Sequence, residues 1–368
     1  AEVSDDGSFV VSKPEGTGGL VSFGTISEQM IYEIGDPQAY LLPDVSCDFS
    51  QVKIEEIGKD KVRVSNAKGR APTDSYKTSA TYEDGSRVGI YHTIVGIDAV
   101  AKAEQTGQAI FKRCSRIFRD LNMADFSETS IEVIGGEASY GPHSQARGAR
   151  EVVLKLAAKH ESAKALEMLV RESSSAATAM AAGTCGLAGN RPKVSPVVRL
   201  FSCLAPKRDI SVAVHINGKV IPVEAPGKGG FDPKTITRPA APAAAAVAAD
   251  AVDVPLVALA YGRSGDKGNH SNIGVIARKP EYLPYIRAAL TEKSVAGYFA
   301  HYLTGKVHRY DLPGINAMNF LLEDILGGGG TASLRNDPQG KGYGQILLGF
   351  SVPVPRALAK ADGLVQAA

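Results

Sequence analysis

The sequence has no excess charge of either sign and no long apolar run. Its 41 Lys and Arg residues are balanced by 39 Asp and Glu residues, which leaves a formal net charge of +2. Such a balance gives no electrostatic support for binding to nucleic acid or to an anionic membrane. No apolar stretch approaches the roughly 20 residues of a membrane span, and no secretory signal is visible. We expect a cytoplasmic globular protein with no nucleic-acid partner and no membrane partner.

Cysteine is scarce and widely spaced. The four cysteines, at positions 47, 114, 185 and 203, form no CxxC pair and have no histidine at ligand spacing. A zinc site is therefore not expected, and reduced, mostly buried thiols are the simpler interpretation. Cys114 lies among apolar residues at helical spacing, which favours core packing. Cys185 has no partner evident in the sequence that would activate it as a nucleophile.

Nucleotide-binding and metal-binding motifs are missing as well. Gly327–Gly330 is followed by Thr331, without the Gly-Lys-Ser/Thr of a P-loop or the spacing of a Rossmann fingerprint. Asp36, Asp44 and Asp48 do not match the spacing of an EF-hand. No Met-Lys-Met type biotin acceptor is present. We predict no cofactor and no metal.

The clearest internal boundary is a stretch rich in proline and alanine. It runs from Arg238 to the end of an alanine run at Ala249, and its composition is typical of a semi-rigid spacer. Strand and helix patterns alternate before it, which favours an α/β to α+β fold class with a mixed sheet. The hundred residues after it are typical of a small α+β domain.

Periodicity predicts the main elements on both sides of this boundary. Before it, we expect a helix over 25–35, a hairpin over 52–65, a long β stretch over 77–94 broken at 84–85, a helix over 110–121, a strand over 152–159 and a helix over 163–171. After it, we expect strands over 256–261, 273–277, 307–310 and 345–354, and helices over 282–290, 295–303 and 316–326.

The most informative segment runs from Tyr261 to Gly274, where charged and amide side chains alternate with glycines. Asp266 and Lys267 could form an acid/base or anchoring pair. The guanidinium of Arg263 could bind a carboxylate or phosphate. The remaining polar candidates in this segment are Ser264, Asn269 and Asn272, and the two amides could orient a carbonyl. A tight glycine turn whose Asp266 accepts backbone N–H groups is the structural alternative.

Two further glycine-rich segments could carry chemistry. Gly328, Gly329, Gly330 and Thr331, followed by Arg335, resemble a loop whose backbone N–H groups converge on an anion. Near the start, Lys13 and Glu15 flank a glycine turn and could form a general base with its modulator. The alternatives are a flexible connector for the first segment and a plain strand-to-helix connection for the second.

Taken together, these segments resemble the AtuA family, the acyclic terpene utilisation proteins. The matching pieces span nearly the whole chain: KPEGTGGLVS (13–22), YEIGDPQAYLLPDV (32–45), GRAPTDSYK (69–77), RPKVSPVVRLFS (191–202), RSGDKGNHSNIG (263–274) and GGGGTASLRNDPQGKGYGQ (327–345).

The resemblance implies a mixed-sheet α/β domain followed by a ferredoxin-like α+β domain. The expected limits are the C-terminal part of the AtuA main domain over 1–237, the linker over 238–251 and the ferredoxin-fold domain over 252–368. Family members usually carry a further α/β segment before the point at which this sequence starts. We therefore expect either a fragment or a partner chain that supplies this segment.

The family's context implies catabolism of terpenoid-derived, branched acyl-CoA esters or hydroxy-acids. The leading hypothesis is an enzyme of hydratase or lyase type with a small acyl-CoA or carboxylate substrate, in which CoA enters only as part of that substrate. Asp266, with Lys267 as its modulator, is the first candidate for proton transfer, and Glu15 is the second. Arg263 and Arg335 would hold carboxylate or phosphate, while the two amides and the Gly328–Gly330 backbone would polarise a carbonyl.

Two other hypotheses remain open. The chain could be a non-catalytic subunit or scaffold associated with acyl-CoA carboxylase machinery, with the ferredoxin-like domain as an assembly element. Both glycine loops could instead be structural, with function in the N-terminal segment that family members usually carry before this sequence starts. A homo-oligomer is the default expectation for a metabolic enzyme of this size.

Overall fold

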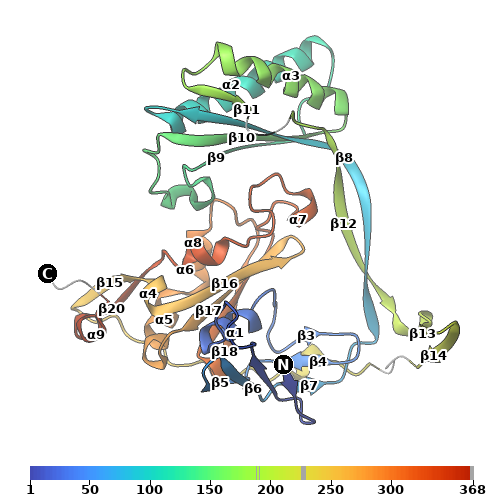
Figure 1. The fold of residues 1–368 in the computed structure, drawn as a ribbon, viewed down its shortest axis with the longest axis vertical. Coiled ribbons are helices and arrows are strands. Elements are labelled where there is room, and N and C mark those ends of the chain that lie inside the picture. The colour runs from blue at the N-terminus through green and yellow to red at the C-terminus, as the bar shows by residue number, and fades with distance from the viewer. Residues whose placement is uncertain (188, 190, 225–228, 365–368) are drawn as a thin grey trace. The chain divides into compact units, whose positions relative to one another are not determined.

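The computed structural model describes residues 1–187, 189, 191–224 and 229–364, which pack as two compact units (Figure 1). Unit 1 comprises Ala1–Ser79, Ser202–Ile325 and Gln339–Ala368. Unit 2 comprises Ala80–Phe201 and Leu326–Pro338. The second glycine-rich loop, at 327–331, therefore belongs to unit 2 although its neighbours in sequence belong to unit 1. Among the described residues no helix is long and apolar enough to cross a membrane.

Unit 2 is built on one sheet with two helices on one face. The strands are β8 (Ser75–Val95), β9 (Glu128–Ile134), β10 (Glu151–His160), β11 (Thr184–Leu187) and β12 (Ser195–Pro206), in the order β11-β8-β10-β9 with β12 also paired to β8. The helices are α2 (Ala99–Asp120) and α3 (Ala163–Ala179), and they lie on the same face of the sheet (Figure 1). The break predicted at 84–85 is wrong, because β8 continues through both residues.

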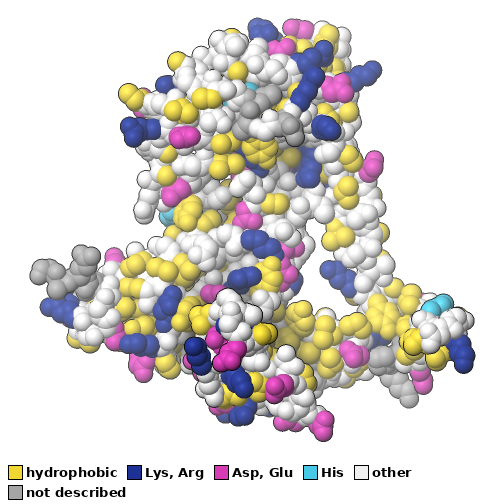
Figure 2. All heavy atoms as spheres, viewed as in Figure 1, with side chains coloured by type: hydrophobic (Ala, Val, Ile, Leu, Met, Phe, Trp, Pro, Cys, Tyr) yellow, Lys and Arg dark blue, Asp and Glu magenta, His cyan; other side chains and the backbone are white. Residues whose placement is uncertain are grey.

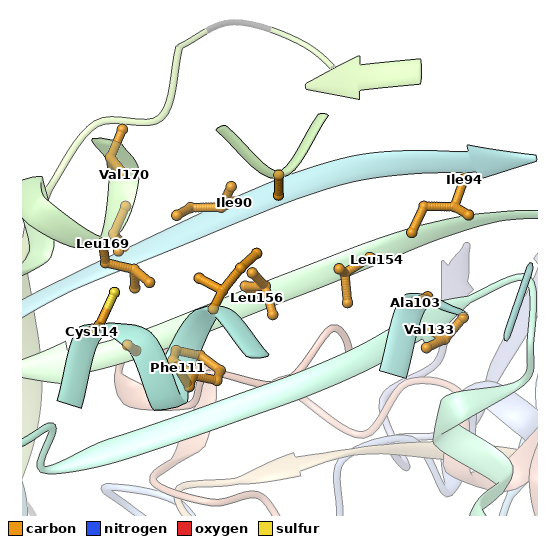
Figure 3. Close-up of a cluster of buried hydrophobic side chains, with 14 of the residues drawn as sticks. Ile90, Ile94, Ala103, Phe111, Cys114, Val133, Leu154, Leu156, Leu169 and Val170 are labelled. Atoms are coloured by element: carbon orange, nitrogen blue, oxygen red, sulfur yellow. The ribbon is translucent and has the colours of Figure 1, made fainter. Parts of the chain in front are cut away.

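Alternate residues of β8 and β10 form the core beneath these helices. Ile90, Ile94, Leu154 and Leu156 are fully buried there and pack with side chains from both helices (Figure 3). Cys114 is part of this cluster, which confirms the core role that its helical spacing predicts. Burial, reinforced by the nearby Glu172 carboxylate, raises the pKa of the Cys114 thiol to about 12, so it stays protonated and unreactive.

Unit 1 contains the C-terminal domain and the N-terminal segment. Its main sheet consists of β16 (Ala260–Lys267), β17 (His270–Ala277), β18 (Val307–Leu312) and β19 (Ala317–Leu322), all antiparallel in the order β16-β17-β19-β18. The helices of this part are α4 (Leu256–Leu259), α5 (Leu283–Ala289), α6 (Glu292–Tyr298), α8 (Tyr343–Leu347) and α9 (Arg356–Ala361), and a two-stranded sheet joins β15 (Ala251–Pro255) to β20 (Ser351–Pro355).

The N-terminal segment adds α1 and two small sheets to unit 1. α1 spans Phe23–Met30 and contacts β5, β16 and β17. The small sheets have the orders β1-β2-β6-β5 and β3-β4-β7, with strands β1 (Glu2–Val3), β2 (Phe9–Ser12), β3 (Tyr40–Leu41), β4 (Ser46–Asp48), β5 (Lys53–Gly58), β6 (Lys61–Ser65) and β7 (Lys68–Arg70). This helix begins before the start predicted at residue 25, because Ser22 is the N-cap and forms a capping box with Thr25.

In the C-terminal domain one predicted element is wrong in type and two predicted strands are wrong in part. The helix predicted over 316–326 is strand β19, which lies between β17 and β18 and is buried almost throughout. A strand buried on both faces is apolar along its length, and this pattern cannot be told from a buried helix by periodicity. The strand predicted over 345–354 begins as helix α8, and the one predicted over 256–261 begins as α4.

The Pro/Ala-rich segment is attached to unit 1 rather than extended away from it. Arg238 forms an ion pair with Asp36 at 2.6 Å, and its guanidinium lies over the ring of Tyr310. Further along, the Ala245 N–H donates to the carbonyl oxygen of Pro284 at 3.0 Å. The segment therefore packs against the domains that it joins in sequence.

Gly274 in β17 is required by a close approach from the end of α1. A Cβ at this position would lie 2.8 Å from Ile31 Cβ and closer still to atoms further along that side chain. Ile31 is fully buried in the core that joins the N-terminal segment to β17, so it cannot move aside freely.

We predict that Gly274→Ala lowers the free energy of unfolding by about 1–3 kcal/mol, the usual cost of overpacking a core. Gly297→Ala is the matched control, because a Cβ at this α6 position meets no atom within 4 Å. Chemical denaturation of both variants tests the prediction. Equal stability of Gly274→Ala and wild type would show that the Ile31 contact does not constrain the hairpin.

Candidate functional site

The segment richest in predicted site residues folds as a β-hairpin rather than as a loop. β16 and β17 pair in register up to Lys267 and His270, so Gly268 and Asn269 form a two-residue turn. Gly268 has φ +67°, which is the conformation that glycine supplies at the first position of a type II′ turn. The hairpin places successive side chains on opposite faces of β16, at the edge of its sheet.

The turn after α1 lies directly against this hairpin. A Cβ at Gly265 would lie 2.5 Å from Glu33 Cγ and 3.0 Å from the Tyr32 ring, so only glycine permits the approach. Glu33 itself has φ 57°, in the left-handed region that residues other than glycine rarely adopt. Such strain is found most often where a side chain must be aimed precisely for binding or catalysis.

Lys341 connects this turn with Asp266. Its ammonium donates to the Tyr32 hydroxyl and to Glu33 Oε1, and it lies 3.5 Å from Asp266 Oδ1. The Gln339 amide also donates to Asp266 Oδ1, at 3.2 Å. The Asp266, Glu33 and Lys341 side chains are 27%, 34% and 38% exposed, so the group is accessible to a solute. We call Tyr32, Glu33, Asp266, Lys267 and Lys341 the acid–lysine cluster.

The pKa values of Lys267 and Glu33 are both lowered, but for different physical reasons. Burial lowers the pKa of Lys267, and the like charges of Lys77 and Lys341 add to this effect, while Glu33 and Asp266 partly oppose it. Burial alone would raise the pKa of Glu33, but the hydrogen bonds from Lys341 and Tyr32 outweigh it and lower the pKa. The cluster thus holds an ionised carboxylate beside a lysine that gives up its proton more readily than usual.

The other polar residues of the hairpin mostly hold protein segments in place. Ser264 is buried, and its hydroxyl donates to the Gly340 carbonyl at 2.7 Å and accepts from the Gly344 N–H at 2.8 Å. Asn272 is fully buried, and its amide donates to the Ile31 carbonyl at 2.8 Å. This geometry favours a positioning role for both residues.

Asn269 and Arg263 are nearer to the surface than Ser264 and Asn272. The Asn269 amide donates to Asp324 Oδ1 at 2.9 Å, which holds the turn after β19. The Arg263 guanidinium is stacked over the Tyr32 ring, 4.4 Å from its centroid, and lies beside the acid–lysine cluster. Of the predicted substrate-binding residues of unit 1, Arg263 is the best placed to meet a ligand.

The structure does not bring all predicted site residues together. Glu15 is exposed, and no interaction in the described part of the chain joins it to Asp266. Gly328, Gly329, Gly330, Thr331 and Arg335 belong to unit 2, where Gly330 and Arg335 line a separate pocket. Cys185 is exposed, and its thiol donates to a nearby backbone carbonyl, that of Gly183.

Sequence reasoning missed Tyr32, Glu33, Gln339 and Lys341. All four lie in segments that carry the family resemblance, Tyr32 and Glu33 at the start of 32–45 and the others within 327–345. Their charge and position in these segments were the only available signal, because nothing local indicates that they meet Asp266. Across the described ranges, no group of three or more His, Cys, Asp or Glu side chains is arranged to hold a metal ion.

The Glu33–Lys341 pair yields a pH-dependent prediction. Because its pKa is lower in the folded protein, Glu33 contributes stability at neutral pH that is lost as the pH falls below its ordinary value of 4.5. We expect Glu33→Gln to melt below wild type at pH 7, with the difference shrinking between pH 4.5 and pH 3. Glu55→Gln, at an exposed position of β5, is the control. A difference in melting temperature that does not change with pH would contradict the ion pair.

Family comparison agrees with the resemblance carried by these segments. The family described as acyclic terpene utilisation family protein AtuA matches residues 1–216, and the AtuA ferredoxin-like domain matches residues 254–353. Comparison with curated proteins finds no match, and neither does comparison with solved structures. Because the first match covers more than half of the 368 residues, the chain belongs to the AtuA family of acyclic terpene utilisation proteins.

Proposed function

We propose that the protein is a catabolic enzyme that adds or removes water on a branched, terpenoid-derived acyl-CoA ester or hydroxy-acid, with Asp266 as the proton-transfer group. The observation that carries this proposal is the acid–lysine cluster. Three distant segments of unit 1 converge there on one carboxylate, which has an amide and an ammonium beside it. Membership of a family for terpene utilisation supports the catabolic direction.

The cluster has the groups that such a reaction needs. In the hydration direction, the Asp266 carboxylate takes a proton from water while the hydroxyl oxygen bonds to Cβ of the conjugated double bond. The electron pair of that double bond passes to Cα and the thioester oxygen, and Cα then accepts a proton. Lys267, with its lowered pKa, suits the second proton transfer, since a general acid is most effective with a pKa near the working pH.

Arg263 supplies the remaining function, which is to hold an anionic substrate. Its guanidinium is fixed over Tyr32, so its planar donor edge is available for a carboxylate or phosphate. Lys341 lies between Glu33 and Asp266, and its positive charge reduces the repulsion between the two carboxylates.

We predict that Asp266→Asn lowers kcat by about 10²–10⁴-fold, the usual contribution of a positioned general acid or base. The assay follows loss of the conjugated thioester absorbance of branched C10 enoyl-CoA esters in water. Asp362→Asn is the control, because Asp362 likewise pairs with a lysine in unit 1 but lies outside the cluster. An Asp266→Asn variant with wild-type turnover would remove this residue from the reaction.

One observation favours a second candidate function, that of a non-catalytic subunit. Strands β13 (Val212–Ile216) and β14 (Lys219–Val223) form a two-stranded sheet that is exposed throughout. Their register places five apolar side chains on one face: Val212, Val214, Ile216, Ile221 and Val223. Apolar side chains also gather over this part of the surface in Figure 2. A lone hairpin is marginally stable in water, so a covered face is the simpler state.

We expect this face to bind protein, either a second copy of the chain or acyl-CoA carboxylase subunits. Val214→Thr combined with Ile221→Thr makes one cross-strand pair polar while keeping both residues β-branched. Light scattering of the purified protein and co-purification with carboxylase subunits are the measurements. Loss of assembly in the double variant supports the subunit role. A wild-type monomer that captures no carboxylase subunit contradicts it.

A further inference from the structure

Unit 2 contains a pocket on the face of its sheet opposite α2 and α3. The pocket has a volume of about 380 Å³ and is lined by residues of β8 and β10, by Ser195 and by Gly330, Ser333, Leu334, Arg335, Asn336 and Pro338. In antiparallel register, Gly89 lies opposite Ala157, so two small residues leave space at the middle of the sheet. Its volume is at the lower end of the range for small-molecule sites, roughly 300–1,000 Å³.

The lining of this pocket is cationic. Arg87, Lys155 and Arg335 belong to this lining, and Lys155 is paired with the carboxylate of Glu132, which lies outside it. Tyr91 and Ser333 add hydroxyl groups to the same lining. Two guanidinium groups and an ammonium offer more N–H donors than the two oxygens of a carboxylate can use, whereas a phosphate has three or more acceptor oxygens and carries close to two charges.

Lys155 is a buried donor aimed into the pocket. It is only 5% exposed, and its ammonium donates to Glu132 Oε2 at 2.7 Å and to the Leu334 carbonyl at 2.8 Å. An ammonium has three N–H donors, and the structure gives the third no partner among the residues that it describes. Because Lys155 lines the pocket, that donor is available to a ligand.

Both arginines of the pocket contact the segment 327–333. The Arg87 guanidinium donates to the Ser333 carbonyl at 3.4 Å, and its other N–H donors have no hydrogen-bond partner within the described part of the chain. The Arg335 guanidinium lies against Gly327, where a Cβ would approach its Nε to 3.2 Å. Gly327 has φ +64°, so the glycine serves both the backbone conformation and the position of Arg335.

We propose that this pocket binds the phosphate group of a phosphorylated small molecule through Arg87, Lys155 and Arg335. The guanidinium groups provide paired, planar donors for two phosphate oxygens, and Lys155 closes the buried side. The site lies wholly within unit 2 and contains no residue of the acid–lysine cluster. The proposal therefore stands whether or not Asp266 is a proton-transfer group.

Isothermal titration of the full chain at low salt tests this site with three probes: inorganic phosphate, CoA and a branched C10 carboxylate. We expect Arg87→Gln and Arg335→Gln each to weaken phosphate or CoA binding about tenfold or more, since each removes charge-assisted hydrogen bonds. Arg116→Gln is the control, because Arg116 is exposed on α2, which covers the opposite face of the sheet.

The outcomes distinguish the sources of the phosphate. Binding of inorganic phosphate and CoA, lost in both arginine variants, identifies a general phosphate site. Binding of CoA alone, with the same loss, identifies the phosphate groups of CoA as the ligand. The proposal is overturned if neither probe binds, if both arginine variants bind as tightly as Arg116→Gln, or if the carboxylate binds most tightly. Melting curves of each variant check that unit 2 remains folded.

Discussion

The close approach of the Ile31–Glu33 turn to the β16–β17 hairpin is the constraint on which unit 1 depends. Glycines at 265 and 274 remove the side chains that would prevent it. The turn leaves helix α1 with carbonyl groups that need partners in a buried setting. Asn272 donates to the Ile31 carbonyl, and Asn319 donates to the carbonyls of Ile34 and Gly35. Two buried amides thus replace the water that these groups would bind in an exposed turn.

This packing also determines where charge is placed at the surface. Once Ile31 is buried against β17, the chain must turn, and Glu33 adopts a left-handed conformation beside β16. The carboxylate of Glu33 then meets Lys341, whose segment is held in turn by the hydroxyl of Ser264. The acid–lysine cluster is therefore a consequence of apolar and glycine contacts beneath it. The β16–β17 hairpin is rich in polar residues, yet packing against the turn after α1 explains much of its composition.

Much of the fold could be predicted from hydrophobic periodicity. Each long helix or strand of unit 2 has one face in the apolar core, and its other face is either exposed or covered by other residues. Residues 152–159 show the limit of that reasoning. The alternation predicts a strand with Lys155 and Lys159 facing water, yet both are about 5% exposed, since residues 326–338 cover Lys155 and cross-strand glutamates pair with both. No local pattern indicates a cover that comes from residues more than a hundred positions away. For the same reason, Asp266 could be predicted as a candidate, but Glu33 and Lys341 could not be predicted as its neighbours.

Glycine has two different physical roles in this chain, and the sequence alone does not show which role applies at which position. At 265 and 274 the backbone is ordinary strand, and the missing Cβ makes room for side chains of another segment. At 327, 328 and 329 the residues have φ between +64° and +106°, and the missing Cβ permits a backbone that L-residues avoid. The first use brings Glu33 and Lys341 to Asp266, so the charges nearly balance. The second use holds Arg335 in the lining that it shares with Arg87 and Lys155, of which Lys155 also pairs with Glu132. A chain with nearly equal numbers of acidic and basic residues thus brings both signs together in the acid–lysine cluster and places two guanidinium groups in the lining of one pocket.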